Sequence, residues 1–234
     1  MSLNQKPDEK ELFDKLIQKS ELKQTVYQNT FESFKIFKKI IEQMSHNYHN
    51  HTKAKKGKFK IPFELKSKSE FEVELKFGGD ILIFMMHTNV FEFSRRHRVM
   101  NTSYVKKDKD RSYCGVIHIY NFLSDSFKYN RMNDVGYLIG RVFINKDKHY
   151  FIEGKRELGF LYNNFGQNIF DEETAKTIVG AAIQYTVNFD LLTPPYENVK
   201  EVSLQEMLIA LNTLSIKTGK RLGFKFQADE NETS

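Results

Sequence analysis

Apolar side chains recur at alternating spacings of three and four residues in the stretch of chain that follows Ser20. The members of this stripe are Tyr27, Thr30, Phe34, Phe37, Ile41 and Met44. Such a repeat places every member on one side of an α-helix, and an apolar side of this size must be covered. The pattern therefore predicts a long amphipathic N-terminal helix within residues 1–50.

Two packing partners for this stripe fit the pattern, namely a sheet of the same chain and a second copy of the chain. We expect the helix to pack on a sheet of its own chain, because fewer than three heptads is short for a stable coiled coil. The alternative is a helix-to-helix seam in a homodimer, and its candidate residues are Tyr27, Phe34, Phe37 and Ile41.

The middle of the chain, residues 61–163, changes to a period of two. Residues 71–77 alternate without interruption between apolar and charged side chains, which predicts a strand with one buried face and one solvated face. Gly78 and Gly79 follow as a two-residue hairpin turn, since both can adopt a positive φ. Residues 81–86 are apolar throughout and indicate a strand inside the sheet.

Further short apolar runs continue the predicted sheet. They are residues 90–93, 113–120, 136–144, 149–153 and 158–162. Residues 145–148 suit a hairpin loop between two of these runs. No helical crossover separates the runs, so we predict a meandering antiparallel sheet of six to seven strands.

Two helices with start signals close the chain. Asp171 precedes the first, and Ser203 with Glu206 forms the S-x-x-E capping box of the second. Both are predicted to pack on the sheet, which gives an α+β fold. We divide the chain into a helical segment 1–50, a sheet with C-terminal helices at 51–226 in one domain with that segment, and an acidic disordered tail at 227–234.

Composition places the chain among globular proteins, with 40% hydrophobic and 28% charged residues. Cys114 is the single cysteine, so the chain has no internal disulfide and suits a reducing compartment. The longest apolar run is far shorter than the roughly 20 residues that span a bilayer. We therefore expect a cytoplasmic protein that does not bind membranes, and no motif predicts a cofactor.

The net charge of +6 is concentrated in residues 51–112, where 15 basic residues face 8 acidic ones. A first basic cluster at 53–60 contains Lys53, Lys55, Lys56, Lys58 and Lys60. A second at 95–111 contains Arg95, Arg96, Arg98, Tyr104, Lys106 and Lys107. Positive charge beside aromatic rings suits nucleic acid, because charge follows the phosphates and rings stack on bases. The other interpretation is two solvated loops.

The remaining candidate chemistry fails on spacing. His46, His49 and His51 cannot share one side of a helix, and no carboxylate or thiol between residues 44 and 60 completes a zinc site. Glu74 and Lys76 have the E-x-K spacing of metal-dependent nucleases, but alternating charges also occur in ordinary cross-strand pairs. We assign no catalytic residue and no metal ligand.

These observations favour a non-catalytic module that binds a small ligand or a protein, with a homodimer as one form. The alternative is a nucleic-acid-binding protein that uses the two basic clusters, followed by a metal-dependent nuclease-like hydrolase. No motif is specific enough to name a family.

Overall fold

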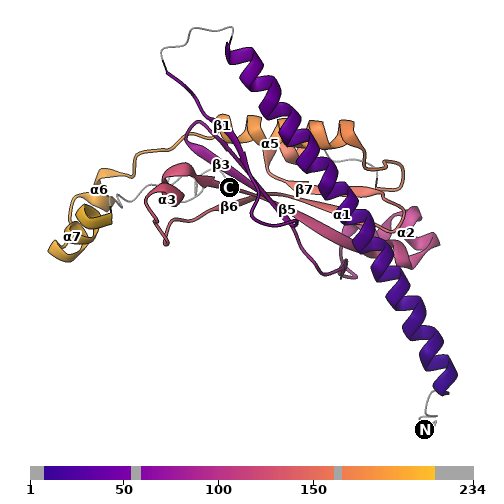
Figure 1. Ribbon diagram of the computed structural model, residues 1–234. Coiled ribbons are helices and arrows are strands. Elements are labelled where there is room, and N and C mark those ends of the chain that lie inside the picture. Colours follow the sequence, from indigo (N-terminus) through magenta and orange to yellow (C-terminus); the bar gives the residue numbers. More distant parts are fainter. Residues whose placement is uncertain (1–7, 54–58, 161–164, 214–234) are drawn as a thin grey trace.

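A computed structural model describes residues 8–53, 59–160 and 165–213 of the 234-residue chain. An antiparallel sheet lies at its centre, and helices α1 (Glu9–Lys53) and α5 (Glu172–Val187) lie side by side over one face of the sheet (Figure 1). The predicted α+β class is confirmed, with a long N-terminal helix, the sheet and C-terminal helices.

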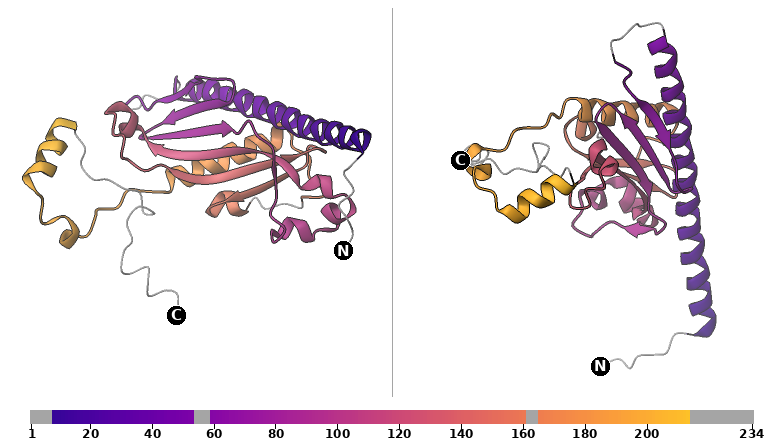
Figure 2. Two further views of the ribbon diagram at one scale, coloured as in Figure 1. Left: turned by 90° about the horizontal axis from the view of Figure 1, so that it is seen from below. Right: turned by 60° about the vertical axis from the view of Figure 1, so that its left-hand side comes forward.

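Helix α1 has 45 residues and is therefore about 68 Å long at about 1.5 Å per residue. Its middle part crosses the sheet, and its N-terminal part extends beyond the rest of the fold (Figures 1 and 2). Phe34, Phe37 and Ile41 are fully buried, and the Phe37 ring lies 5.6 Å from Phe84 and 5.2 Å from Phe170. The apolar stripe thus packs on the sheet of its own chain.

Within the described residues the sheet contains seven strands, and every pair of neighbours is antiparallel. The main path runs β1 (Phe63–Lys66), β2 (Glu72–Phe77), β3 (Asp80–Met86), β5 (Tyr113–Leu123), β6 (Tyr137–Asn145) and β7 (Tyr150–Gly154). The short β4 (Phe91–Glu92) pairs with the beginning of β5. This is the meandering order that the absence of crossover helices predicts.

Strand β2 shows the predicted division of faces. Val73, Leu75 and Phe77 are buried under the helices, and the charged residues point to the other face. Glu74, however, is only 8% exposed, and Lys68 pairs with it, with its Nζ 2.6 Å from the carboxylate. The charged face is therefore less exposed to solvent at Glu74 than the alternating pattern predicts. At the end of β2 the hairpin turn is confirmed, and Gly78 has a φ of 54°.

Helix α1 comes unusually close to β5 at one point. A Cβ atom on Gly115 would lie 2.1 Å from Oγ1 of Thr30, which is itself fully buried. Only glycine leaves enough room for the helix backbone to approach the strand at this position.

The opposite face of the sheet has a smaller core at one end. It is covered by η1 (Arg98–Asn101), α2 (Ser103–Lys107) and η2 (Lys109–Ser112), which we call the cover segment, residues 98–112. The buried residues of this smaller core are Val99, Val105, Cys114, Val116, Phe143, Phe151 and Phe165. At the other end of β5 the chain turns into α3 (Ser124–Lys128).

One predicted strand is wrong. Residues 158–160 belong to the short helix α4 (Arg156–Phe160), and residues 161 and 162 lie outside the described chain. Leu158 is fully buried against Gly154 at the end of β7, and its backbone N–H donates to the Lys155 carbonyl. The run from 158 to 162 shows no alternation, so its apolar character fits a buried helical turn as well as a strand.

The last described helices are α6 (Tyr196–Val199) and α7 (Leu204–Thr213). The capping box of α7 is confirmed, since Glu206 N–H donates to Ser203 Oγ at 3.1 Å and Ser203 N–H donates to the Glu206 carboxylate at 3.1 Å. The position differs from the prediction, because α5 packs on the sheet whereas α7 stands away from it (Figure 2). Pro194 and Pro195 prevent a continuous helix and favour extended backbone between α5 and α6. This extended segment leads the chain away from the sheet.

Candidate functional site

The N-terminal part of α1 is an uncovered helix. Every side chain from residue 8 to residue 21 is exposed. Large apolar side chains nevertheless occupy this stretch, namely Leu12, Phe13, Leu16 and Ile17, and Leu16 is 62% exposed. At about 100° per residue these four lie on one side of the helix, roughly a third of a turn away from Leu22 and Val26, which are buried. We call these four residues the N-terminal stripe.

The C-terminal arm, residues 188–213, carries a second uncovered apolar surface. All of its side chains from residue 196 to residue 208 are exposed, and so is Leu211. On α7 the spacing of three, one and three places Leu204, Met207, Leu208 and Leu211 on one side. Both ends of the described chain therefore present helices whose apolar sides contact little of their own fold.

The four seam candidates are placed differently from these surfaces. Phe34, Phe37 and Ile41 lie inside the core against the sheet, and Tyr27 is half-buried beside it. These side chains are therefore covered by their own chain.

The described residues of the two basic clusters lie far apart. Lys19 contacts the Tyr113 ring at 3.6 Å, directly after the cover segment, whereas Lys53 lies 34 positions further along the same helix. At about 1.5 Å per residue that separation is about 50 Å. Lys53 and Lys60 are exposed, while Lys55, Lys56 and Lys58 lie outside the described residues.

The second cluster is partly occupied by internal contacts. The Tyr104 hydroxyl donates to Asp147 Oδ2 at 2.6 Å, and the Tyr104 ring stacks on His149 at 4.9 Å. Burial, together with the hydrogen bond to Asp147, raises the pKa of Tyr104 well above its usual value. Arg111 pairs with the same carboxylate at 2.9 Å. Tyr104 is thus engaged on its ring and its hydroxyl, while five cluster members remain exposed: Arg95, Arg96, Arg98, Lys106 and Lys107.

An ionic network ties His97, directly before the cover segment, to β6 and β7. Val99 N–H donates to Nδ1 of His97, so the other ring nitrogen, Nε2, carries the proton that faces Glu153 at 3.0 Å. The second carboxylate oxygen of Glu153 accepts from Arg141. Burial raises the pKa of Glu153, but the hydrogen bonds from His97 and Arg141 outweigh burial and hold it below its usual value. Both oxygens are engaged, which indicates an anchoring role.

Glu74 and Lys76, the residues with E-x-K spacing, fit cross-strand pairing. Glu64 lies opposite Lys76, and Lys66 lies opposite Glu74, in the register of β1 with β2. Within the part of the chain that the structure describes, no group of three or more His, Cys, Asp or Glu side chains is arranged to hold a metal ion. His46, His49 and His51 are exposed on α1, which remains helical to Lys53.

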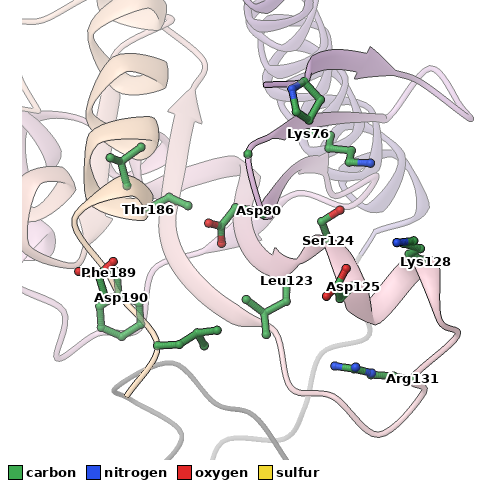
Figure 3. A pocket seen from close by; sticks show the side chains of 15 residues that line it. Lys76, Asp80, Leu123, Ser124, Asp125, Lys128, Arg131, Thr186, Phe189 and Asp190 are labelled. Carbon is green, nitrogen blue, oxygen red and sulfur yellow. The ribbon is translucent and has the colours of Figure 1, made fainter. Parts of the chain in front are cut away.

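A pocket of about 940 Å³ lies at the end of the sheet opposite the cover segment (Figure 3). Its walls come from the β2–β3 turn, the junction of β5 with α3, and the residues at the end of α5. Its charged lining residues are Lys76, Asp80, Asp125, Lys128, Arg131 and Asp190. These residues lie far apart in the sequence, so no local motif could reveal the pocket.

The N-terminal stripe, by contrast, did leave a sequence signal. Its four apolar residues follow a spacing of one, three and one, with charged or polar residues at every position between them. That pattern predicts a helix side, but it does not say whether the sheet extends far enough to cover it.

Comparison with known proteins does not assign the chain to a family. No family model matches the chain, and searches of curated proteins and of solved structures found no match. Although α1 is long enough to cross a bilayer, neither it nor another helix of the described residues has the sustained apolar character that crossing requires.

Proposed function

We propose that this chain is a non-catalytic protein-binding module that associates with a second copy of itself through the N-terminal stripe. The observation that carries the proposal is the run of exposed side chains from residue 8 to residue 21, in which four large apolar residues share one side of a helix. Contiguous apolar patches of this kind on a folded chain mark interaction sites.

Isolated helical turns are only marginally stable in water. All side chains in the first three turns of α1 are exposed, and Lys19 at their end contacts the Tyr113 ring, although the helix continues without interruption into the core. Burying the N-terminal stripe against a partner would stabilise these turns and remove its apolar surface from water.

The stripe complements a second copy in an antiparallel arrangement. With a two-fold axis between Asp14 and Lys15, Leu12 of one copy faces Ile17 of the other, and Phe13 faces Leu16. On the flank, Lys10 of one copy lies near Glu21 of the other, so opposite charges meet beside the apolar contacts. Because the same surface serves both copies, the interaction closes as a dimer.

Sedimentation equilibrium of the full chain tests this proposal. We expect a mass of two chains, and Leu16→Glu should shift it to one chain because the new charge would be buried opposite Phe13. Gln18→Glu is the matched control, since it adds the same charge two residues away on the back of the same helix. A single-chain mass for the unchanged protein, or dissociation by both variants alike, contradicts the proposal.

The nucleic-acid-binding alternative has less support from the geometry. The second cluster lies near the Lys19 end of α1, whereas Lys53 of the first cluster lies at the other end of that helix, and Tyr104 is held in internal contacts. It stays a prediction with its own test, in which affinity for oligonucleotides falls steeply with salt and Arg95→Ala with Arg96→Ala reduces that slope.

A further inference from the structure

The middle of the sheet face opposite α1 and α5 carries a row of apolar side chains. Ile83 on β3 pairs with Tyr120 on β5, and Tyr120 pairs with Leu138 on β6, so the three lie side by side across this face. Met85 lies two residues beyond Ile83 and extends the row along β3. Met85 is 37% exposed and Leu138 is 38% exposed, while Ile83 and Tyr120 are half-buried. We call these four residues the central patch. His118 adjoins it, with its ring 5.7 Å from that of Tyr120.

The composition of this face is that of a covered sheet. A sheet face that stays in water usually carries polar side chains at every second position, as β2 does with Glu72 and Glu74. Strand β3 beside it does not, because all of its residues on this face are apolar. The cover segment packs on one end of the face, and Phe127 of α3 packs on Phe122 at the other end. The central patch lies between these two covers and remains partly exposed.

Helix α7 has the size and the surface to cover the central patch. Its apolar side faces solvent, and Leu204 is 76% exposed and Leu211 is 66% exposed. Its 10 residues make it about 15 Å long, at about 1.5 Å per residue. Three adjacent strands are about 14 Å wide, because neighbouring strands lie about 4.8 Å apart. One side of α7 can therefore lie across β3, β5 and β6.

The chain that connects α7 to the sheet is long enough for this contact. Figure 1 shows α7 beyond the end of the sheet that carries α3. Leu191 and Leu123 line the same pocket at that end, and Tyr120 lies three residues from Leu123 along β5, or about 10 Å. Residues 192–203 can span about 30 Å even with α6 intact. All side chains from residue 196 to residue 203 are exposed, so little packing holds α7 in its outer position.

We propose that α7 closes over the central patch of its own chain and buries both apolar surfaces. The tether gives α7 an effective concentration of about 1 mM at the patch, whereas a second copy competes only at the concentration of the chain in solution. Closure removes apolar area from water on both surfaces, which is the driving force for the contact. The closed form involves neither the N-terminal stripe nor a second copy, so it does not depend on dimerisation.

Tryptophan fluorescence of the full chain tests the proposal. The chain contains no tryptophan, so Leu208→Trp introduces a single indole on the apolar side of α7. We expect acrylamide to quench this indole at least about twofold less well than after Met85→Glu and Leu138→Glu are added, because the closed form holds more than half of the molecules. Both sheet positions are partly exposed and tolerate a charge, which far-UV circular dichroism checks. If the double change unfolds the sheet, Met85→Glu alone replaces it.

Leu16→Glu, added to the Leu208→Trp chain, is the matched control. It makes the same change at an exposed apolar position on the N-terminal stripe and should leave quenching unchanged, which separates this result from the test of dimerisation. Quenching should also be the same from about 1 to about 100 μM chain, because the contact is intramolecular. The proposal is overturned if the indole is as accessible as in the urea-unfolded chain, if the patch variants leave quenching unchanged, or if shielding increases with chain concentration.

Discussion

The close approach of α1 to β5 allows a direct test of how the helix is seated. In Gly115→Ala the new Cβ would lie 2.1 Å from Oγ1 of Thr30 and 2.8 Å from its Cβ and Cγ2, whereas ordinary contacts begin at 3.4 Å. Thr30 is fully buried and its hydroxyl donates to the Val26 carbonyl at 2.7 Å, so it cannot rotate away without losing that bond. Either α1 or β5 must move by about 1 Å.

Overpacking of this kind costs about 1–3 kcal/mol, and the severity of the contact places Gly115→Ala near 3 kcal/mol. For a domain of this size, that loss lowers Tm by about 6–12 °C. Thr30→Ala alone should cost about 1–2 kcal/mol through the small cavity it leaves. In the double variant the worst contact is gone and only the 2.8 Å contact with Cβ remains. We therefore expect the double variant to be more stable than the sum of the single changes by about 1–2 kcal/mol.

Urea unfolding followed by far-UV circular dichroism at a fixed chain concentration measures all three variants. Gly180→Ala on α5 is the control, because its Cβ would meet no atom within 4 Å. It should stabilise the protein by about 0.5–1 kcal/mol, the usual gain of alanine over glycine inside a helix. A neutral Gly115→Ala, or strictly additive losses in the double variant, would refute the reasoning.

Three further changes probe other parts of the fold. Asp171 caps α5 by accepting from Thr174 N–H at 2.8 Å, so Asp171→Ala should cost about 1 kcal/mol in the free energy of unfolding, measured in urea. Burial, together with the nearby charges of Arg141 and His87, lowers the pKa of His118 in the folded protein. As the pH falls, His118 is therefore protonated in the unfolded chain before it is protonated in the folded protein. The free energy of unfolding should decrease as the pH falls below about 6.5. His118→Leu should flatten that loss in thermal scans across pH, and an unchanged slope would contradict it. Phe34→Asp places a charge in the core and should abolish the folded circular dichroism spectrum.

Local sequence patterns predicted the elements whose structure depends on neighbours along the chain. The alternation of residues 71–77 identified both the strand and its buried face, and Ser203 with Glu206 identified the start of α7. Both signals are local, because a strand period and a capping box each depend on a few consecutive residues. Residues 158–160 were misassigned because a short apolar run without alternation fits a strand and a buried helical turn alike.

Features that depend on distant contacts were not predictable in the same way. Phe34 and Leu16 belong to apolar stripes on the same helix, yet Phe34 is buried and Leu16 is exposed. The difference is set by where the sheet ends under α1, which no spacing within the helix encodes. The pocket likewise depends on Lys128 and Thr186 being brought together by the sheet and α5.

The buried position of Cys114 provides a way to measure how often the cover segment opens. Its thiol is fully buried in the smaller core beneath Val105, and burial raises its pKa. A reagent in solution therefore reacts with it only when that layer lifts or the whole chain unfolds. Native-state alkylation compared with the global unfolding free energy would show whether residues 98–112 open on their own, using the cysteine that the chain already contains.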